Sequence, residues 1–335
     1  MATILLTGAA GFVGFHLARR LCADGHEVVG VDDLKPLFPA LKAERLRRLR
    51  EIPGFLGLVQ DVSDTRMTDG LFADLRPALV VHLAAQTGVR FSVEHPFEYE
   101  RTNVLGMLSI LEAARRHGTQ RVVFASSSSV YGNSLRVPWR EDDRADAPVS
   151  LYAATKRADE LMASAFAATH GLCTVGLRYF TVYGPFGRPD MAVWTFADAI
   201  ANGEPVPLFD GGSMRRDFTY VDDVVEATRL ALFDTGLSGA SVFNVGAGQP
   251  RELDVLLRAL ETNLGRPAIR MMLPAQAGDV NATWADASAL KAAVGFLPGT
   301  TLEEGVAAFS RWFLENPDVV DAVRRERSLG RRLVG

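Results

Sequence analysis

The chain has 335 residues with a formal net charge of −4, 48% hydrophobic residues and two cysteines. This length suits one large domain with a smaller appended one, and the weakly acidic balance gives no reason to expect nucleic acid as a partner. Two cysteines rule out a disulfide framework, no run of about 18 apolar residues predicts a membrane span, and the absence of a leader-like start indicates the cytoplasm.

The first predicted strand, Thr3–Thr7, runs directly into a glycine-rich turn and then into a helical pattern from Phe15 to Cys22. Glycines allow the backbone to turn tightly and to approach a pyrophosphate, while a helix N-terminus offers it unpaired amides and partial positive charge. This order of elements predicts a dinucleotide site whose contacts include Gly8, Gly11, Phe12, Val13 and Gly14.

The second predicted strand, His26–Val31, ends at Asp32. A carboxylate at this position can accept both hydroxyls of an adenosine ribose and would repel a 2′-phosphate. No arginine follows at Asp33 or Leu34. We therefore predict NAD rather than NADP, the alternative being that Asp32 only caps the next turn.

Strands and helices continue to alternate along the chain. A basic helix at Leu41–Arg50 has either a solvated charged face or phosphate contacts. Strands are predicted at 55–59 and 79–85, with Asp61 and Val62 near the adenine and Leu83, Ala84 and Ala85 along the cofactor.

A helix from about Thr102 to His117 leads into the apolar strand Arg121–Ala125. Such strands, separated by helices, predict an α/β fold with a doubly wound parallel sheet of the Rossmann type. We expect an NAD-binding domain at residues 1–180, which also receives later strands at about 215–248. Residues 181–335 would form a smaller C-terminal α/β region that binds the substrate.

Tyr152 and Lys156 lie four residues apart in a predicted helix that ends near His170, so their side chains share one helix face. A lysine ammonium stabilises a neighbouring phenolate, which allows a tyrosine to act as a base near neutral pH. The same spacing also occurs as an exposed surface pair, but the glycine turn favours the catalytic interpretation.

These residues fall within longer motifs. The chain resembles extended short-chain dehydrogenases/reductases, and among them nucleotide-sugar 4-epimerases, most closely UDP-glucuronate 4-epimerases. The resemblance runs from Gly8 to about Asp286 and rests on the segments at 84–90, 126–132, 150–156, 178–191 and 214–223.

The resemblance implies a role for each matching residue. Tyr152 would be the acid/base, Lys156 would hold the nicotinamide ribose, and Ser127 would bind the reacting oxygen, with Asn103, Tyr179 and Phe180 around the nicotinamide. The UDP-sugar would contact Arg90, Ser128, Ser129, Thr181, Arg188, Leu208, Phe209, Arg216 and Asp279. Arg90 and Arg188 would bind either the sugar carboxylate or the diphosphate, unless they form structural ion pairs. Leu208 and Phe209 would pack either on the uracil or in the core.

The implied reaction inverts C4 of a UDP-sugar through a 4-keto intermediate, with NAD retained between turnovers. Thr181, where galactose-type epimerases more often carry asparagine, favours UDP-glucuronate and UDP-galacturonate as substrates. Ser128 and Ser129 stand where dehydratases have an Asp-Glu pair and decarboxylases a glutamate.

The alternatives are a UDP-glucose/UDP-galactose 4-epimerase, a UDP-glucuronate decarboxylase and a non-enzymatic NAD sensor. No metal is expected, because the six histidines lack ligand spacing. A homodimer through the helices near Met107 and Leu161 is expected, although these helices could equally be core.

Overall fold

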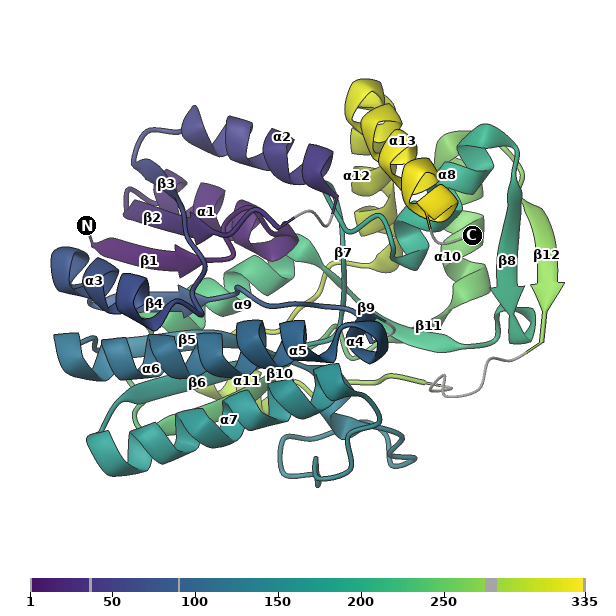
Figure 1. The fold of residues 1–335 in the computed structure, drawn as a ribbon. Helices are drawn as coiled ribbons and strands as arrows, with labels where there is room; N and C mark the ends of the chain where they lie inside the picture. Colours follow the sequence, from purple (N-terminus) through teal and green to yellow (C-terminus); the bar gives the residue numbers. More distant parts are fainter. Residues whose placement is uncertain (1, 36–37, 90, 275–281, 334–335) are drawn as a thin grey trace.

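The computed structural model describes residues 2–35, 38–89, 91–274 and 282–333. A seven-stranded sheet forms its centre, in the order β10-β6-β5-β4-β1-β2-β3 (Figure 1). All of its neighbouring strands are parallel. The strands are β1 Thr3–Thr7, β2 Glu27–Asp32, β3 Phe55–Val59, β4 Leu79–His82, β5 Arg121–Ser127, β6 Cys173–Tyr179 and β10 Ala240–Val245. This architecture confirms the predicted fold class.

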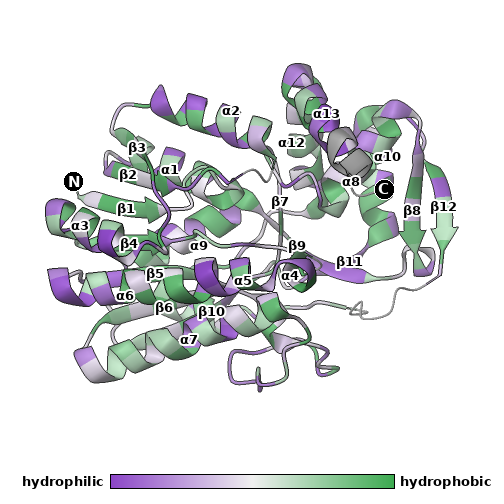
Figure 2. Cartoon of the chain, in the orientation of Figure 1, coloured by the Kyte–Doolittle hydropathy of each residue, from purple (hydrophilic) through white to green (hydrophobic). Residues whose placement is uncertain are grey.

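The sheet is covered on both faces because successive strand residues point in opposite directions. In β1, Ile4 and Leu6 pack in one hydrophobic cluster, and Leu5 packs in another. The first cluster includes α1 Phe12–Ala23 and α9 Val221–Phe233, and the second includes α3 Thr65–Leu75, α6 Gly106–His117 and α7 Leu151–His170. Hydrophobic residues accordingly dominate the strands, whereas α2 Pro39–Arg50 is largely hydrophilic (Figure 2).

Two predicted elements differ from the structure near the cofactor edge. The strand expected at 79–85 ends at His82, because Ala84 N bonds the side chain of Thr7 (3.2 Å) and Gln86 N bonds that of Asn103 (2.8 Å). The helix expected from about Thr102 is preceded by a π-helical turn, η1 Glu100–Leu105, and α6 begins only at Gly106. Such turns inside helices are frequent at functional sites.

The C-terminal part adds two small sheets and several helices beside the carboxyl ends of the central strands. One sheet joins β7 Thr181–Tyr183, β9 Arg215–Tyr220 and β11 Pro250–Glu252, and the other joins β8 Pro205–Phe209 and β12 Ile269–Leu273. The helices of this part are α8 Ala192–Asn202, α10 Leu253–Leu264, α12 Leu302–Glu315 and α13 Pro317–Leu333, whereas α11 Ser288–Val294 packs against α9 and β10 of the central sheet. The remaining short elements are α4 Phe91–Glu94, α5 Pro96–Tyr99, η2 Ser128–Tyr131 and η3 Asp210–Gly212.

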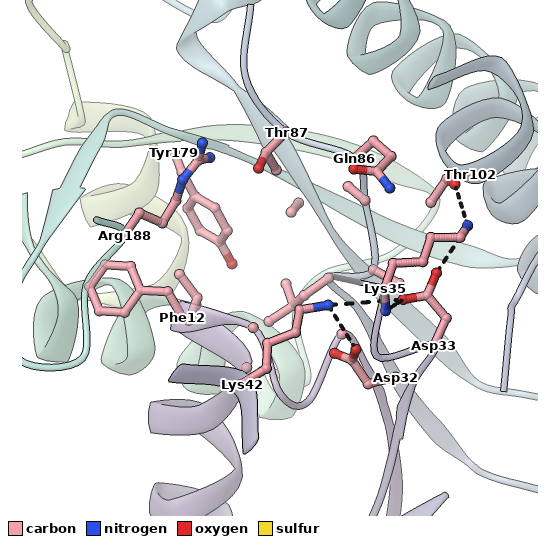
Figure 3. Close-up of a pocket in the computed structure, with 18 of the residues that line it drawn as sticks. Phe12, Asp32, Asp33, Lys35, Lys42, Gln86, Thr87, Thr102, Tyr179 and Arg188 are labelled. Carbon is pink, nitrogen blue, oxygen red and sulfur yellow. Dashed lines mark hydrogen bonds and ion pairs between the residues drawn. The ribbon is translucent and has the colours of Figure 1, made fainter. Parts of the chain in front are cut away.

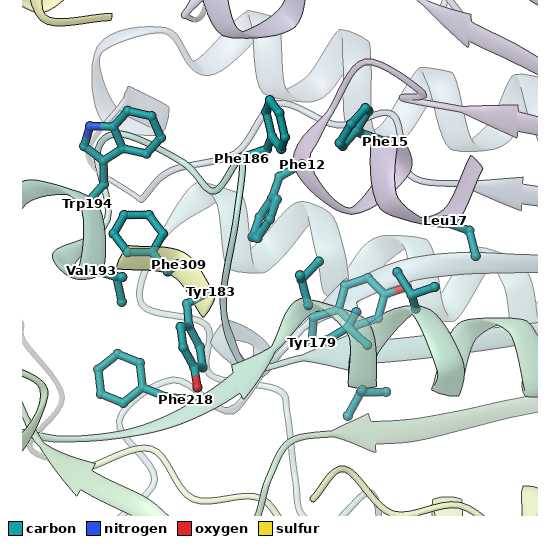
Figure 4. Close-up of a cluster of buried hydrophobic side chains, with 14 of the residues drawn as sticks. Phe12, Phe15, Leu17, Tyr179, Tyr183, Phe186, Val193, Trp194, Phe218 and Phe309 are labelled. Atoms are coloured by element: carbon teal, nitrogen blue, oxygen red, sulfur yellow. The ribbon is translucent and has the colours of Figure 1, made fainter. Parts of the chain in front are cut away.

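One hydrophobic cluster connects the two parts of the chain. Phe15 of α1 packs against Phe186 with tilted rings, and Trp194 of α8 lies against Phe309 (Figure 4). Phe186 also packs against Trp312 of α12. Of the later segments, β10 joins the central sheet, whereas β9 pairs with β7 and β11. The division of function near residue 180 stays a proposal.

Candidate active site

Two cavities meet at the carboxyl edge of the central sheet. A cavity of about 280 Å³ follows the ends of β1, β2 and β4, and a wider one of about 1370 Å³ extends towards α8, β8 and α13. Figure 3 shows residues that line the first cavity. Seven described residues line both: Thr87, Ser127, Tyr152, Tyr179, Phe180, Arg188 and Met191. The edge can therefore hold two ligands in contact with each other.

The glycine turn provides a close backbone surface for one of these ligands. Gly8 has a φ of +71°, and a Cβ added to it would lie 2.7 Å from Ala84 N. A Cβ on Gly14 would lie 2.1 Å from the carbonyl oxygen of Gly8. Gly8, Gly11, Phe12, Val13 and Gly14 all line the first cavity, at the N-terminus of α1. The turn thus fits a pyrophosphate, as the sequence predicts.

Asp32 lies at the end of β2 in the same cavity, with 8% of its surface exposed. Its carboxylate accepts hydrogen bonds from the backbone N–H groups of Ala10 (3.1 Å) and Leu34 (2.9 Å), and from Nζ of Lys42 (3.1 Å). Figure 3 shows Lys42 beside Asp32 and Lys35 beside Asp33. A carboxylate held in this position suits the hydroxyls of a ribose.

Asp61 and Val62 line the far end of this cavity. Burial favours the neutral form of Asp61, but the hydrogen bonds from Ser63 and the nearby charges of Lys35 and Arg101 hold its pKa below the ordinary value. Asp61 is therefore an anionic acceptor, which suits the amine of an adenine.

Sequence reasoning missed two cavity residues on α2, Lys42 and Arg45. Arg45 is buried and donates hydrogen bonds to the carbonyl oxygens of Ala10 (3.0 Å) and Phe186 (2.5 Å), and burial lowers its pKa to about 9. The available signal was its position between Leu41 and Leu49, four residues from each on the buried face. The solvated-face interpretation describes only the other side of this helix.

The middle of the first cavity is lined by Leu83, Ala84 and Ala85. Tyr179 presents its ring to both cavities, while its hydroxyl shares a hydrogen bond with Thr228 Oγ1 (2.8 Å). Asn103 is fully buried and is not among the described residues that line either cavity. Its contribution to the cofactor site is therefore indirect, through Gln86 and Thr155.

Tyr152 and Lys156 come from the first turns of α7, which begins behind a serine cap, since Ser150 Oγ accepts from Ala153 N (3.1 Å). Tyr152 lines both cavities, and Lys156 lines the first. Lys156 is 3% exposed, and its Nζ donates to the carbonyl oxygen of Ala125 (3.0 Å) and to Asp159 Oδ2 (3.1 Å). An ammonium has three donors. The described part of the chain supplies two acceptors, which leaves one N–H of Lys156 for a ligand.

Ser127 ends β5 and lines both cavities, as Tyr152 does. The wider cavity is lined by the predicted substrate residues Ser128, Ser129, Thr181, Arg188 and Phe209. Arg188 also forms an ion pair with Asp190 (2.5 Å). The structure therefore places these hydroxyl groups and the Arg188 guanidinium in the cavity that Tyr152 also lines.

The remaining predicted substrate residues are Leu208, Arg216, Arg90 and Asp279. Leu208 is fully buried in the hydrophobic core, as the core alternative predicts. Arg216 donates to the carbonyl oxygen of Arg215 (2.9 Å) and is not among the described lining residues of either cavity. Arg90 and Asp279 lie outside the described residues.

Within the described ranges, no group of three or more His, Cys, Asp and Glu side chains could hold a metal ion. A search of the same ranges finds no helix with the length and apolar character needed to cross a membrane.

Comparison with known proteins places these features in a family. The chain is 43% identical over 330 residues to a probable UDP-glucuronate 4-epimerase of Rhizobium meliloti, and the match covers 93% of this chain and 97% of that relative. It resembles the solved UDP-glucuronic acid 4-epimerase of Bacillus cereus in complex with UDP-glucuronic acid and NAD, at a TM-score of 0.87 and 32% identity over 93% of this chain and 99% of that one.

A second solved structure, the UDP-glucose 4-epimerase of Thermotoga maritima with UDP-glucose, has a TM-score of 0.86 and 33% identity, covering 94% of this chain and 99% of that one. Residues 4–246 match the model of the NAD-dependent epimerase/dehydratase family. This family match is joined by a relative that is 43% identical over nearly its whole length. The chain therefore belongs to the NAD-dependent epimerase/dehydratase family.

Proposed function

We propose that this protein is an NAD-dependent 4-epimerase that interconverts UDP-glucuronate and UDP-galacturonate. The observation that carries this proposal is the position of Tyr152 and Ser127, which line both the glycine-turn cavity and the wider cavity. A sugar in the wider cavity would then meet the tyrosine hydroxyl and the cofactor at one carbon. The similarity to the epimerases of Rhizobium meliloti and Bacillus cereus supports the same substrate.

In this mechanism Tyr152 takes the proton from the C4 hydroxyl of the sugar and later returns it, so no second acid or base is needed. Lys156 stabilises the phenolate with its ammonium, and Ser127 holds the C4 oxygen by a hydrogen bond. NAD, held by the glycine turn and Asp32, would supply the hydride chemistry at C4.

The size of the wider cavity bears on the inversion step. The keto sugar must turn over between the two hydride transfers, so its ring has to be held loosely while the nucleotide is held firmly. A cavity of about 1370 Å³ leaves room for that rotation. Phe209, at its far side, offers a ring for the uracil, and Arg188 a charge for the diphosphate or the carboxylate.

The acid substrate carries a specific hazard, because a C4 ketone beside the C5 carboxylate is a β-keto acid. It loses carbon dioxide when the carboxylate bond aligns with the carbonyl π system. Ser128, Ser129 and Thr181 all line the wider cavity, and we infer that their hydroxyls hold the carboxylate out of this alignment.

The test measures the C4 inversion of UDP-glucuronate by the Tyr152→Phe variant and by the wild type. We expect kcat to fall by about two to four orders of magnitude, with the retained NAD unchanged. Tyr220→Phe, at a half-buried tyrosine that is not a lining residue of either described cavity, is the matched control. Full activity of Tyr152→Phe would refute the mechanism. Wild-type turnover of UDP-glucose alone would favour the neutral epimerase, and carbon dioxide release would favour the decarboxylase.

We further propose a cytoplasmic homodimer. Apolar side chains remain exposed on neighbouring helices, among them Leu108 of α6 (41% exposed), Leu161 of α7 (57%) and Phe97 of α5 (84%). Met107, in contrast, is fully buried within the subunit. Light scattering on Leu161→Glu should give a monomer where the wild type gives a dimer, and a monomeric wild type would refute the assembly.

A further inference from the structure

Beneath the catalytic lysine lies a carboxylate that the proposed reaction does not use. Asp159 is 1% exposed, and its Oδ2 lies 3.1 Å from Lys156 Nζ. Its Oδ1 is buried and has no hydrogen-bond partner among the described residues. Asp159 is not a described lining residue of either cavity, so it cannot contact a ligand there directly.

We propose that Asp159 is a positioning residue that holds the Lys156 ammonium in place and sets the pH window in which the Tyr152–Lys156 pair is active. This inference rests on the proposed function of the pair. A buried carboxylate with one free oxygen is costly, and its ion pair with Lys156 is the contact that offsets this cost.

The surroundings leave few other groups to titrate. His82 on β4 faces Lys156, and burial together with the lysine charge lowers its pKa to about 3, so it is neutral above that pH. Glu160 faces Asp159 but is held by Arg178 at 2.8 and 2.9 Å and by Arg157 at 2.7 Å. The charge of Glu160 is thus already balanced, and Asp159, Lys156 and Tyr152 remain.

A negative charge raises the pKa of every ionisable neighbour. The Asp159 carboxylate, 3.1 Å from Lys156 Nζ, therefore favours the charged ammonium, and it also offsets part of the field by which Lys156 favours the Tyr152 phenolate. Removing the charge should move both limbs of the pH profile in the same direction, to lower pH.

The charge of Asp159 itself depends on pH. Burial raises its pKa to about 6, although Lys156 acts in the opposite direction. Above this pH Asp159 is ionised and the pair is neutral. Below it the carboxyl becomes neutral, and the wild type should behave like a variant that lacks the charge.

The experiment compares kcat against pH for the wild type, Asp159→Asn and Asp159→Glu, with Asp318→Asn, at an exposed position on α13, as control. We expect both limbs of Asp159→Asn to shift to lower pH and its profile to converge with the wild type below about pH 6. Asp159→Glu should restore the wild-type limbs. A purely structural role would lower kcat at every pH without moving either limb.

A second readout does not depend on turnover. Ionisation of a tyrosine changes its ultraviolet absorbance, and the contribution of Tyr152 is the difference between each protein and the same protein carrying Tyr152→Phe. In Asp159→Asn this difference should appear at lower pH. Unmoved limbs and an unmoved titration would refute the proposal while leaving the epimerase function intact. An inactive wild type would instead refute the function. If both Asp159→Asn and Asp159→Ser fail to fold, the residue is structural and the proposal is wrong.

Discussion

Asn103 Nδ2 donates a hydrogen bond to Thr155 Oγ1 at 2.9 Å and so ties the turn η1 to α7, one residue before Lys156. The same side chain makes two hydrogen bonds with the backbone of Gln86, at 2.8 and 3.1 Å. Because Asn103 is fully buried, water cannot replace these contacts. The wall of the first cavity at Gln86 and the helix α7 are therefore held by one amide.

We expect Asn103→Ala to lower the free energy of unfolding by about 3 kcal/mol, because it removes the three hydrogen bonds that the buried amide makes with Gln86 and Thr155. Retention of NAD during purification should fall as well. Urea denaturation and the ultraviolet spectrum of released dinucleotide measure both effects. The control is Asn263→Ala, which removes an exposed side-chain hydrogen bond to the carbonyl oxygen of Ala259 on α10. An equal effect of the two variants would contradict the role given to Asn103.

The ion pair between Asp32 and Lys42 leads us to expect that substitution of Asp32 changes the preference between NAD and NADP. Lys42 Nζ pairs with Asp32 at 3.1 Å, so Asp32→Ser frees an ammonium where a 2′-phosphate would lie. A charge-assisted hydrogen bond contributes about 1.5–3 kcal/mol, and we expect the NADP-to-NAD affinity ratio to rise by at least about tenfold.

Calorimetric titration of protein stripped of dinucleotide measures this ratio. The double variant Asp32→Ser/Lys42→Met should lose the gain, because it lacks the ammonium. An unchanged ratio in Asp32→Ser would show that Lys42 does not reach the 2′ position.

We expect substitution of Thr181 to change the distribution of products. Thr181→Val keeps the shape of the side chain but removes the hydroxyl that would orient the sugar carboxylate. We expect kcat/KM for UDP-glucuronate to fall by about tenfold, in line with one lost hydrogen bond to a charged group, and the fraction of turnovers that release carbon dioxide to rise. Thr262→Val, at an exposed site on α10, should change neither quantity, and equal carbon dioxide release by both variants would contradict the role.

Two buried histidines predict how stability depends on pH. Burial lowers the pKa of His16 to about 4 and of His82 to about 3, whereas an unfolded histidine titrates near 6.5. Between these values the unfolded chain binds more protons than the native one, so stability rises with pH and is lost as pH falls below about 6.5. Each histidine should contribute a slope of about 1.4 kcal/mol per pH unit.

Urea denaturation of the wild type and His82→Asn between pH 7 and pH 5 tests this linkage. The variant lacks one titrating group, so its free energy of unfolding should fall less steeply. The exposed His170→Asn should follow the wild type, and parallel slopes for His82→Asn and the wild type would contradict the prediction.

Much of the fold and part of the site could be predicted from the sequence because their signals are local. The apolar runs of β1 and β5 and the glycines of the first turn express backbone requirements that hold wherever such segments occur. Tyr152 and Lys156 could be paired because a helix places residues four apart on one face.

Other features depend on contacts between distant segments. Lys42 and Arg45 looked like members of a solvated charged face, and only the packing of α2 against the glycine turn brings them into the cavity. The π-helical turn at Asn103 also follows from partners 17 and 52 residues away, Gln86 and Thr155.

The sequence by itself determined the alternation of strands and helices in the first 180 residues, the dinucleotide turn and the tyrosine–lysine spacing, since short-range backbone geometry encodes each of them. The tertiary structure alone decided that Thr87, Tyr152 and Arg188 would line both cavities, and that Asp159 would be buried under Lys156. These relationships arise when separate elements exclude water from one another, and no local spacing specifies which side chains then meet.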